Sequence, residues 1–94
     1  METKNFLNKN KGTIVDVRTP VEFMSGNVPG SINIPLQEIN KRISELKNLT
    51  PPLILCCASG ARSAQATRLL TEHGIECKNG GSWLSLNYSQ PKSV

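Results

Sequence analysis

The sequence predicts a three-layer α/β domain with a mostly parallel sheet of four to five strands flanked by helices. Two observations predict this class. Short apolar or β-branched segments alternate with helical segments along the chain. The connections between those segments are too long for hairpins and have the length of crossovers. A chain of 94 residues has room for one domain.

Composition divides the chain into an arm, a domain and a tail. Residues 1–12 are polar and form an N-terminal arm, which frays or caps the domain. Residues 13–88 carry the alternating pattern and hold the domain. Residues 89–94 form a loose C-terminal tail.

The first elements are read from β-branched runs and helix-start signals. Residues 13–17 are β-branched and predict a buried strand. Thr19 as N-cap and Pro20 at the first helical position predict a short helix after it. Residues 31–34 predict a second strand, which Pro35 ends.

The later elements continue the alternation. Apolar residues at spacings of three, four and three predict an amphipathic helix over residues 36–47. The run 53–56 is apolar throughout, which is typical of a strand in the middle of a parallel sheet. The remaining elements are a helix from Arg62 or Ser63 to His73-Gly74, a strand over 75–78, a turn at 79–81 and a short helical piece over 82–87.

Charge and cysteine content limit the partners and the compartment. The net charge is +4, but the basic residues are scattered and do not alternate with aromatic residues, so nucleic acid is not an expected partner. A mild positive field attracts small anions. Three cysteines form no disulfide framework, and no segment has the length of a signal peptide or a membrane span. We therefore expect a cytoplasmic monomer that does not bind membranes.

The junction after the third predicted strand is the most informative part of the chain. Cys57 follows the strand end, and the helix begins a few residues later. The first free N–H groups of a helix stabilise an anion, so a thiol placed there favours its thiolate form. A thiolate is the nucleophilic form of cysteine. Cys57 is therefore the candidate nucleophile.

The residues after Cys57 suit a ring of backbone amides around its sulfur. Small side chains let the ring close, and Gly60 can adopt a positive φ. Arg62 either faces the pocket or pins the loop, and Ser63 either caps the helix or donates to the sulfur. The predicted substrate-binding loop consists of Ala58, Ser59, Gly60, Ala61, Arg62 and Ser63.

This loop resembles the active-site loop of the rhodanese-like sulfurtransferases, in which cysteine, glycine, arginine and serine stand in a cysteine-x-x-glycine-x-arginine-serine pattern. Two further matches stand at the family's spacing. The first begins at Asp16-Val17-Arg18 and continues through Glu22-Phe23, Gly26, Pro29-Gly30-Ser31 and Asn33-Ile34-Pro35. The second is Gly80-Gly81 followed by Trp83. The resemblance covers roughly residues 13–86.

The resemblance implies a sulfur-transfer reaction. Cys57 would take a sulfur atom from thiosulfate or a persulfide, become a persulfide, and pass that sulfur to cyanide, a thiol or a protein sulfur carrier. It implies neither a metal nor an organic cofactor. It also implies the strand order 75–78, 53–56, 13–17, 31–34, with the family's usual first strand absent or reduced to residues 3–7.

The resemblance gives three residues a supporting role beside the loop. Arg18 and Glu22 stand four apart, a spacing that allows them to pair over a helical turn. Asp16 stands in an apolar strand and needs partners for its burial, so we expect it to hold either loop amides or the arginine. Two positions depart from the family pattern. Asn27 replaces the usual histidine, and Ala58 replaces a cation that would help to bind the sulfonate end of thiosulfate.

Other interpretations of the cysteines stay open at this point. Counted from Cys56, Arg62 has the spacing of a phosphatase or arsenate reductase loop, although the glycine is then displaced by one position. A non-catalytic binding or regulatory module of the same fold is the other alternative. Cys56 is expected to be a buried strand residue on the opposite side from Cys57. Cys77 is expected to be part of the core, and a resolving role through a disulfide with Cys57 is the alternative. His73 is expected to have no chemical role, whereas Trp83 is expected to pack in the fold, with a place at the rim of the pocket as the alternative.

Overall fold

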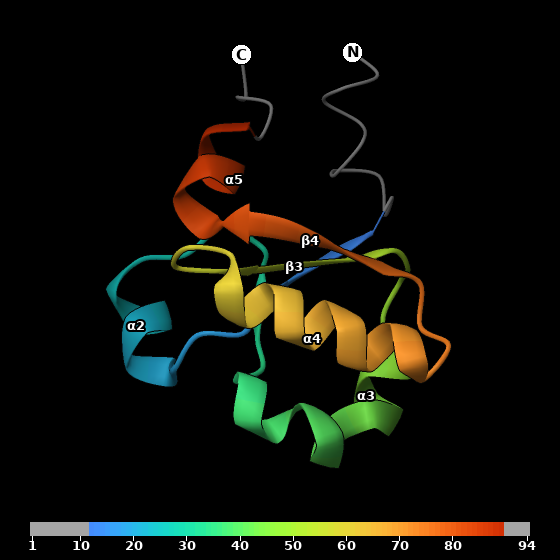
Figure 1. The fold of residues 1–94 in the computed structure, drawn as a ribbon. Coiled ribbons are helices and arrows are strands. Elements are labelled where there is room, and N and C mark those ends of the chain that lie inside the picture. The colour runs from blue at the N-terminus through green and yellow to red at the C-terminus, as the bar shows by residue number, and fades with distance from the viewer. Residues whose placement is uncertain (1–11, 90–94) are drawn as a thin grey trace.

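A computed structural model describes residues 12–89 and contains a four-stranded parallel sheet (Figure 1). The strands lie in the order β2-β1-β3-β4, which confirms the predicted order. Residues 3–7, where a reduced extra strand was expected, lie outside the described residues. The strands are β1 (Thr13–Asp16), β2 (Ile32–Asn33), β3 (Leu53–Cys57) and β4 (Cys77–Ser82).

Helices cover both faces of this sheet, which confirms the three-layer class (Figure 1). One face packs against η1, α3 and α4 around a cluster that includes Ile39, Leu46 and Leu70. The other face packs against α5 through Trp83 and Leu86. The helices are α2 (Pro20–Ser25), the 3-10 helix η1 (Leu36–Arg42), α3 (Ile43–Lys47), α4 (Ala61–Glu72) and α5 (Trp83–Ser89).

The prediction of one amphipathic helix over residues 36–47 is wrong. A 3-10 helix runs to Arg42 and a short α-helix follows it. Arg42 leaves the helical conformation at the junction, with φ −119° and ψ 26°. A spacing of three places residues on one face of a 3-10 helix as well as of an α-helix, so the apolar pattern did not distinguish the two.

The last strand also differs from its prediction, because β4 runs from Cys77 to Ser82 and includes the expected turn residues. The pairing of β3 with β4 shifts between Leu55 and Cys56, so that Gly80 is the extra residue of a bulge. Gly80 lies close to β3, where an added Cβ would stand 2.7 Å from Cγ2 of Ile54. A glycine at this position therefore allows β4 to pack closely against β3, and it does not form the expected turn.

Candidate active site

Cys57 is the last residue of β3, and Cys56 precedes it in the same strand. Side chains alternate along a strand, so the two sulfurs lie on opposite faces of the sheet. Cys57 belongs to the buried cluster under α4, whereas Cys56 belongs to the cluster under α5. The predicted division between the two cysteines is confirmed, and only Cys57 faces the start of α4.

The loop after Cys57 turns its backbone amides toward the sulfur. The N–H of Gly60 donates to Sγ at 3.0 Å, and the N–H of Ser63 donates at 3.4 Å. The hydroxyl of Ser63 lies 3.5 Å from the same atom. Gly60 is the N-cap residue of α4 with a φ of +105°, a conformation that side-chain-bearing residues avoid. Two of the expected backbone donors, Gly60 and Ser63, therefore point at the sulfur.

The other loop residues have distinct places. Ala58, Ser59 and Ala61 are exposed, and Ala61 is the first residue of α4, one position before the predicted start. Ser63 is buried in the first turn of α4 and does not act as its N-cap. Cys57 itself has no exposed surface. The sulfur therefore lies beneath a loop whose outer residues reach solvent.

The pKa values of the two adjacent thiols are shifted in opposite directions. Burial raises the pKa of Cys57, but the Ser63 hydroxyl and the N–H groups of Ser63, Gly60 and Ser59 lower it by more, so the net pKa lies below the ordinary value. Burial, with a smaller contribution from the Asp16 carboxylate, raises the pKa of Cys56 to about 12. Cys57 is the thiol that ionises more readily.

Arg62 pins the loop to α2 through Glu22. Its guanidinium donates to both carboxylate oxygens, at 2.8 and 3.0 Å. Hydrogen bonds from Arg62 and from the Thr19 backbone hold the pKa of Glu22 at about 2. The predicted pairing of Arg18 with Glu22 is therefore wrong, because Glu22 closes the capping box of α2 with Thr19 and turns toward α4.

Asp16 and Arg18 instead form a buried pair at the end of β1. The guanidinium donates to the carboxylate through Nε at 2.9 Å and Nη2 at 2.8 Å. Asp16 is fully buried and Arg18 is 4% exposed. The expectation that Asp16 holds the arginine is confirmed. Nη2 also donates to the Gly26 carbonyl at 2.6 Å, and the Trp83 ring lies 4.6 Å from the guanidinium carbon.

Asn79 was not expected at the site. The Ser63 hydroxyl donates to its Oδ1 at 2.6 Å, and its Nδ2 donates to the Gly60 carbonyl at 3.2 Å. Little in the sequence indicated this contact, because an asparagine before two glycines is more typical of a turn. The bulge in β4 brings Asn79 to the loop.

The remaining sites considered in the sequence lie apart from this loop. Nδ1 of His73 lies 3.0 Å from the carbonyl of Leu69 at the end of α4. Cys77 is partly buried between β4 and α4. Within residues 12–89, no three His, Cys, Asp or Glu side chains gather in a group that could hold a metal ion. Nor is any helix in that range long and apolar enough to span a bilayer.

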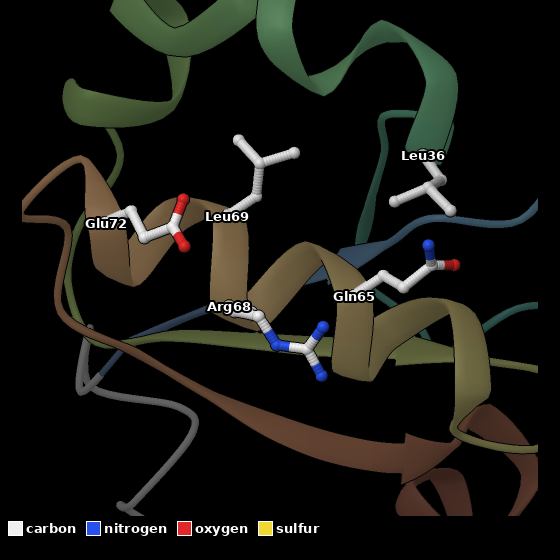
Figure 2. Close-up of a pocket in the computed structure, with 5 residues that line it drawn as sticks. All are labelled: Leu36, Gln65, Arg68, Leu69 and Glu72. Atoms are coloured by element: carbon white, nitrogen blue, oxygen red, sulfur yellow. The ribbon is translucent and has the colours of Figure 1, made fainter.

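A groove of about 290 Å³ lies between α4 and the start of η1 (Figure 2). Leu69 points from α4 toward η1 and α3, whereas Arg68 points away from them. None of the predicted site residues lines this groove. Its lining consists of Leu36, Gln65, Arg68, Leu69 and Glu72.

Comparisons with known proteins identify a family and several relatives of this chain. The family model described as "Rhodanese-like domain" matches residues 2–85. The chain is 32% identical over 75 residues to Thiosulfate sulfurtransferase GlpE of Pseudoalteromonas translucida, a match that covers 80% of this chain and 70% of the relative. It is 38% identical over 61 residues to a protein named Sulfurtransferase of Allochromatium vinosum, covering 65% of this chain and 56% of the relative.

A solved structure shares the fold over most of both chains. This is a rhodanese with anions from Escherichia coli, with a TM-score of 0.71 and 32% identity, covering 87% of this chain and 96% of the other. Several curated relatives are longer, however. The matched segment spans only 34–56% of three of them.

Proposed function

This chain belongs to the rhodanese-like domain family, and from that premise we propose that it is a sulfurtransferase that works through a persulfide on Cys57. The observation that carries the proposal is the pair of backbone N–H groups that donate to Sγ, from Gly60 at 3.0 Å and from Ser63 at 3.4 Å. These donors favour a negatively charged sulfur, which is the form that attacks. Relatives named sulfurtransferase support the general enzyme class.

In the first proposed step, the Cys57 thiolate attacks the outer sulfur of thiosulfate. A new S–S bond forms, the S–S bond of thiosulfate breaks, and sulfite leaves with the electron pair. The persulfide carries a negative charge on its outer sulfur, and the loop amides stabilise that charge as an oxyanion hole would. A low-molecular-weight or protein persulfide is the alternative donor.

In the second step, cyanide or an acceptor thiolate attacks the outer sulfur, and Cys57 leaves again as a thiolate. Neither step needs an external oxidant or reductant. The acceptor becomes thiocyanate or a persulfide, and a thiol of a carrier protein could serve in the same way. Ala58 supplies no cation for a sulfonate group, so persulfide donors suit this loop at least as well as thiosulfate.

The supporting residues have structural parts in this proposal. Glu22 and Arg62 tie the loop to α2, and Asp16 and Arg18 hold the end of β1. We also place the protein in the cytoplasm, because Cys56, Cys57 and Cys77 are all free thiols and a reducing compartment keeps them so.

Incubation of the full chain with thiosulfate, or with a glutathione-type persulfide, tests the proposal by mass spectrometry. We expect one added sulfur on the peptide that contains Cys57, removed again by cyanide with release of thiocyanate. Cys57→Ser abolishes the addition, while the matched variant Cys56→Ser retains it. No added sulfur from either donor, on a folded chain, would contradict the proposal.

One observation favours a second candidate, a binding module without catalysis. Cys57 has no exposed surface, so a donor must displace part of the loop to reach the sulfur. A module of this kind would be folded, would take up no sulfur and would leave Cys57 resistant to small alkylating agents near neutral pH. Hydrolysis of an aryl phosphate, or reduction of arsenate, by the folded chain would instead indicate a phosphatase or an arsenate reductase.

A further inference from the structure

The Ser63 hydroxyl has one proton and three neighbouring acceptors. Oδ1 of Asn79 lies at 2.6 Å, the Gly60 carbonyl oxygen at 3.1 Å and Sγ of Cys57 at 3.5 Å. A hydroxyl donates to only one acceptor with good geometry at a time. The shortest of these contacts is the one to Asn79, so this is where the proton lies at rest.

Asn79 is itself held in one orientation. The N–H of Gly81 donates to Oδ1 at 2.9 Å, and Nδ2 donates to the Gly60 carbonyl at 3.2 Å. These two contacts place the amide oxygen toward Ser63, because the NH₂ group is occupied by a carbonyl. The bulge at Gly80 brings this side chain to the loop, since Asn79 pairs with Leu55 and Gly81 with Cys56.

We propose that Asn79 is a positioning residue that holds the Ser63 hydroxyl proton away from the sulfur of Cys57. The resting thiol can then donate to the Ser63 oxygen while Ser63 donates to Asn79. Once the thiolate forms, the backbone amides of the loop remain as its main donors, and the hydroxyl reaches the sulfur only by breaking its bond to Asn79. The inference builds on the proposed function, in which Cys57 reacts as a thiolate.

The charged side chains around the loop are paired with one another and do not account for the position of the Ser63 proton. Arg62, on α4, is paired with Glu22 from α2. Asp16, at the end of β1, is paired with Arg18. All four stay in place in the variants below, so any change in the ionisation of Cys57 comes from Asn79 and Ser63.

The test follows the ionisation of Cys57 through the carbon chemical shift of its Cβ during a pH titration. This signal reports on one thiol and needs neither solvent access nor sulfur transfer. We expect Asn79→Ala to lower the midpoint by about half to one pH unit, because the freed hydroxyl then donates to the thiolate. Asn79→Asp should raise it, because a second negative charge then lies beside the sulfur.

Ser63→Ala supplies the matched background. Alone, it should raise the midpoint by less than about half a unit, because the hydroxyl lies 3.5 Å from Sγ with its proton on Asn79 and so lowers the pKa of Cys57 only weakly. In that background Asn79→Ala should no longer lower the midpoint. Urea unfolding of each variant verifies the fold, and Ser63→Ala still tests the inference if an Asn79 variant does not fold.

Two results would overturn the inference. One is a rise in midpoint for both Asn79→Ala and Asn79→Asp, which is what simple loosening of the loop produces. The other is a rise of a full unit or more in Ser63→Ala, which means that the hydroxyl already serves the thiolate. Neither result bears on sulfur transfer. If Cys57 titrates as expected but takes up no sulfur, the proposed function is contradicted and the inference about Asn79 is not.

Discussion

Replacing Gly60 with alanine tests whether the loop conformation itself supports the Cys57 thiolate. Gly60 has a φ of +105° and its N–H donates to Sγ at 3.0 Å. An added Cβ would meet the Cα of Gly81 at 3.5 Å, which is an ordinary contact, so the cost is backbone strain and not a clash. Positive φ costs a non-glycine residue about 1–2 kcal/mol.

The loop can relieve that strain by rotating the Gly60 peptide, and this takes the N–H away from the sulfur. A hydrogen bond to a charged acceptor is worth about 1.5–3 kcal/mol, which corresponds to roughly one to two pKa units. We therefore expect Gly60→Ala to raise the pKa of Cys57 by that amount and to lower the free energy of unfolding by about 1–2 kcal/mol. Urea unfolding and a pH titration of the thiol measure the two effects.

Gly74 offers a matched control at the far end of α4. It also has a positive φ, +76°, and an added Cβ there would meet nothing within 4 Å. Gly74→Ala should lose a similar free energy of unfolding without any change in the pKa of Cys57. Equal destabilisation of both variants with unchanged thiol titration in Gly60→Ala would refute the idea that this amide stabilises the thiolate.

Three further predictions concern the charged groups of the site. The carboxyl of Glu22 should titrate with a midpoint of about 2 by NMR and return toward 4.5 in Arg62→Ala, whereas a wild-type midpoint near 4.5 would show that the pair does not form in solution. The pKa of Cys57 is lowered from 9.0 in the folded chain, so the folded state loses the thiol proton more readily than the unfolded state. The resulting stabilisation is complete above about pH 9 and is lost as the pH falls through the folded pKa. The difference in unfolding free energy between wild type and Cys57→Ser should therefore grow from pH 7 to 9, and a constant difference would contradict the lowered pKa. Arg18→Ala leaves the fully buried carboxylate of Asp16 uncompensated and should cost about 3–5 kcal/mol in thermal or urea unfolding, with a loss below about 1 kcal/mol counting against a buried pair.

Local patterns in the sequence predicted β1 and β3 and the place of Cys57 at the end of β3. The β-branched run 13–17 and the apolar run 53–56 predicted β1 and β3, because burial on both faces of a parallel strand requires continuous apolar residues. Thr19 and Pro20 predicted the start of α2, because capping depends on neighbouring backbone groups. Cys57 followed from its place between a strand end and a helix start.

Partners of polar side chains were decided only by the tertiary structure. Arg18 and Glu22 stand four residues apart, yet Glu22 pairs with Arg62, which is forty positions further along the chain. Side-chain pairs between elements depend on how α2 and α4 pack, and sequence spacing records only contacts within one element. Asn79 reached the loop through a bulge that depends on the pairing of β4 with β3.

The sequence by itself determined the order of the elements and the one thiol that stands at the start of a helix, since both follow from residue types that are close along the chain. The tertiary structure decided which donors surround that thiol and which groups hold those donors in place. Hydrogen-bond direction depends on atomic positions contributed by β3, β4 and α4 together, and no local pattern encodes them.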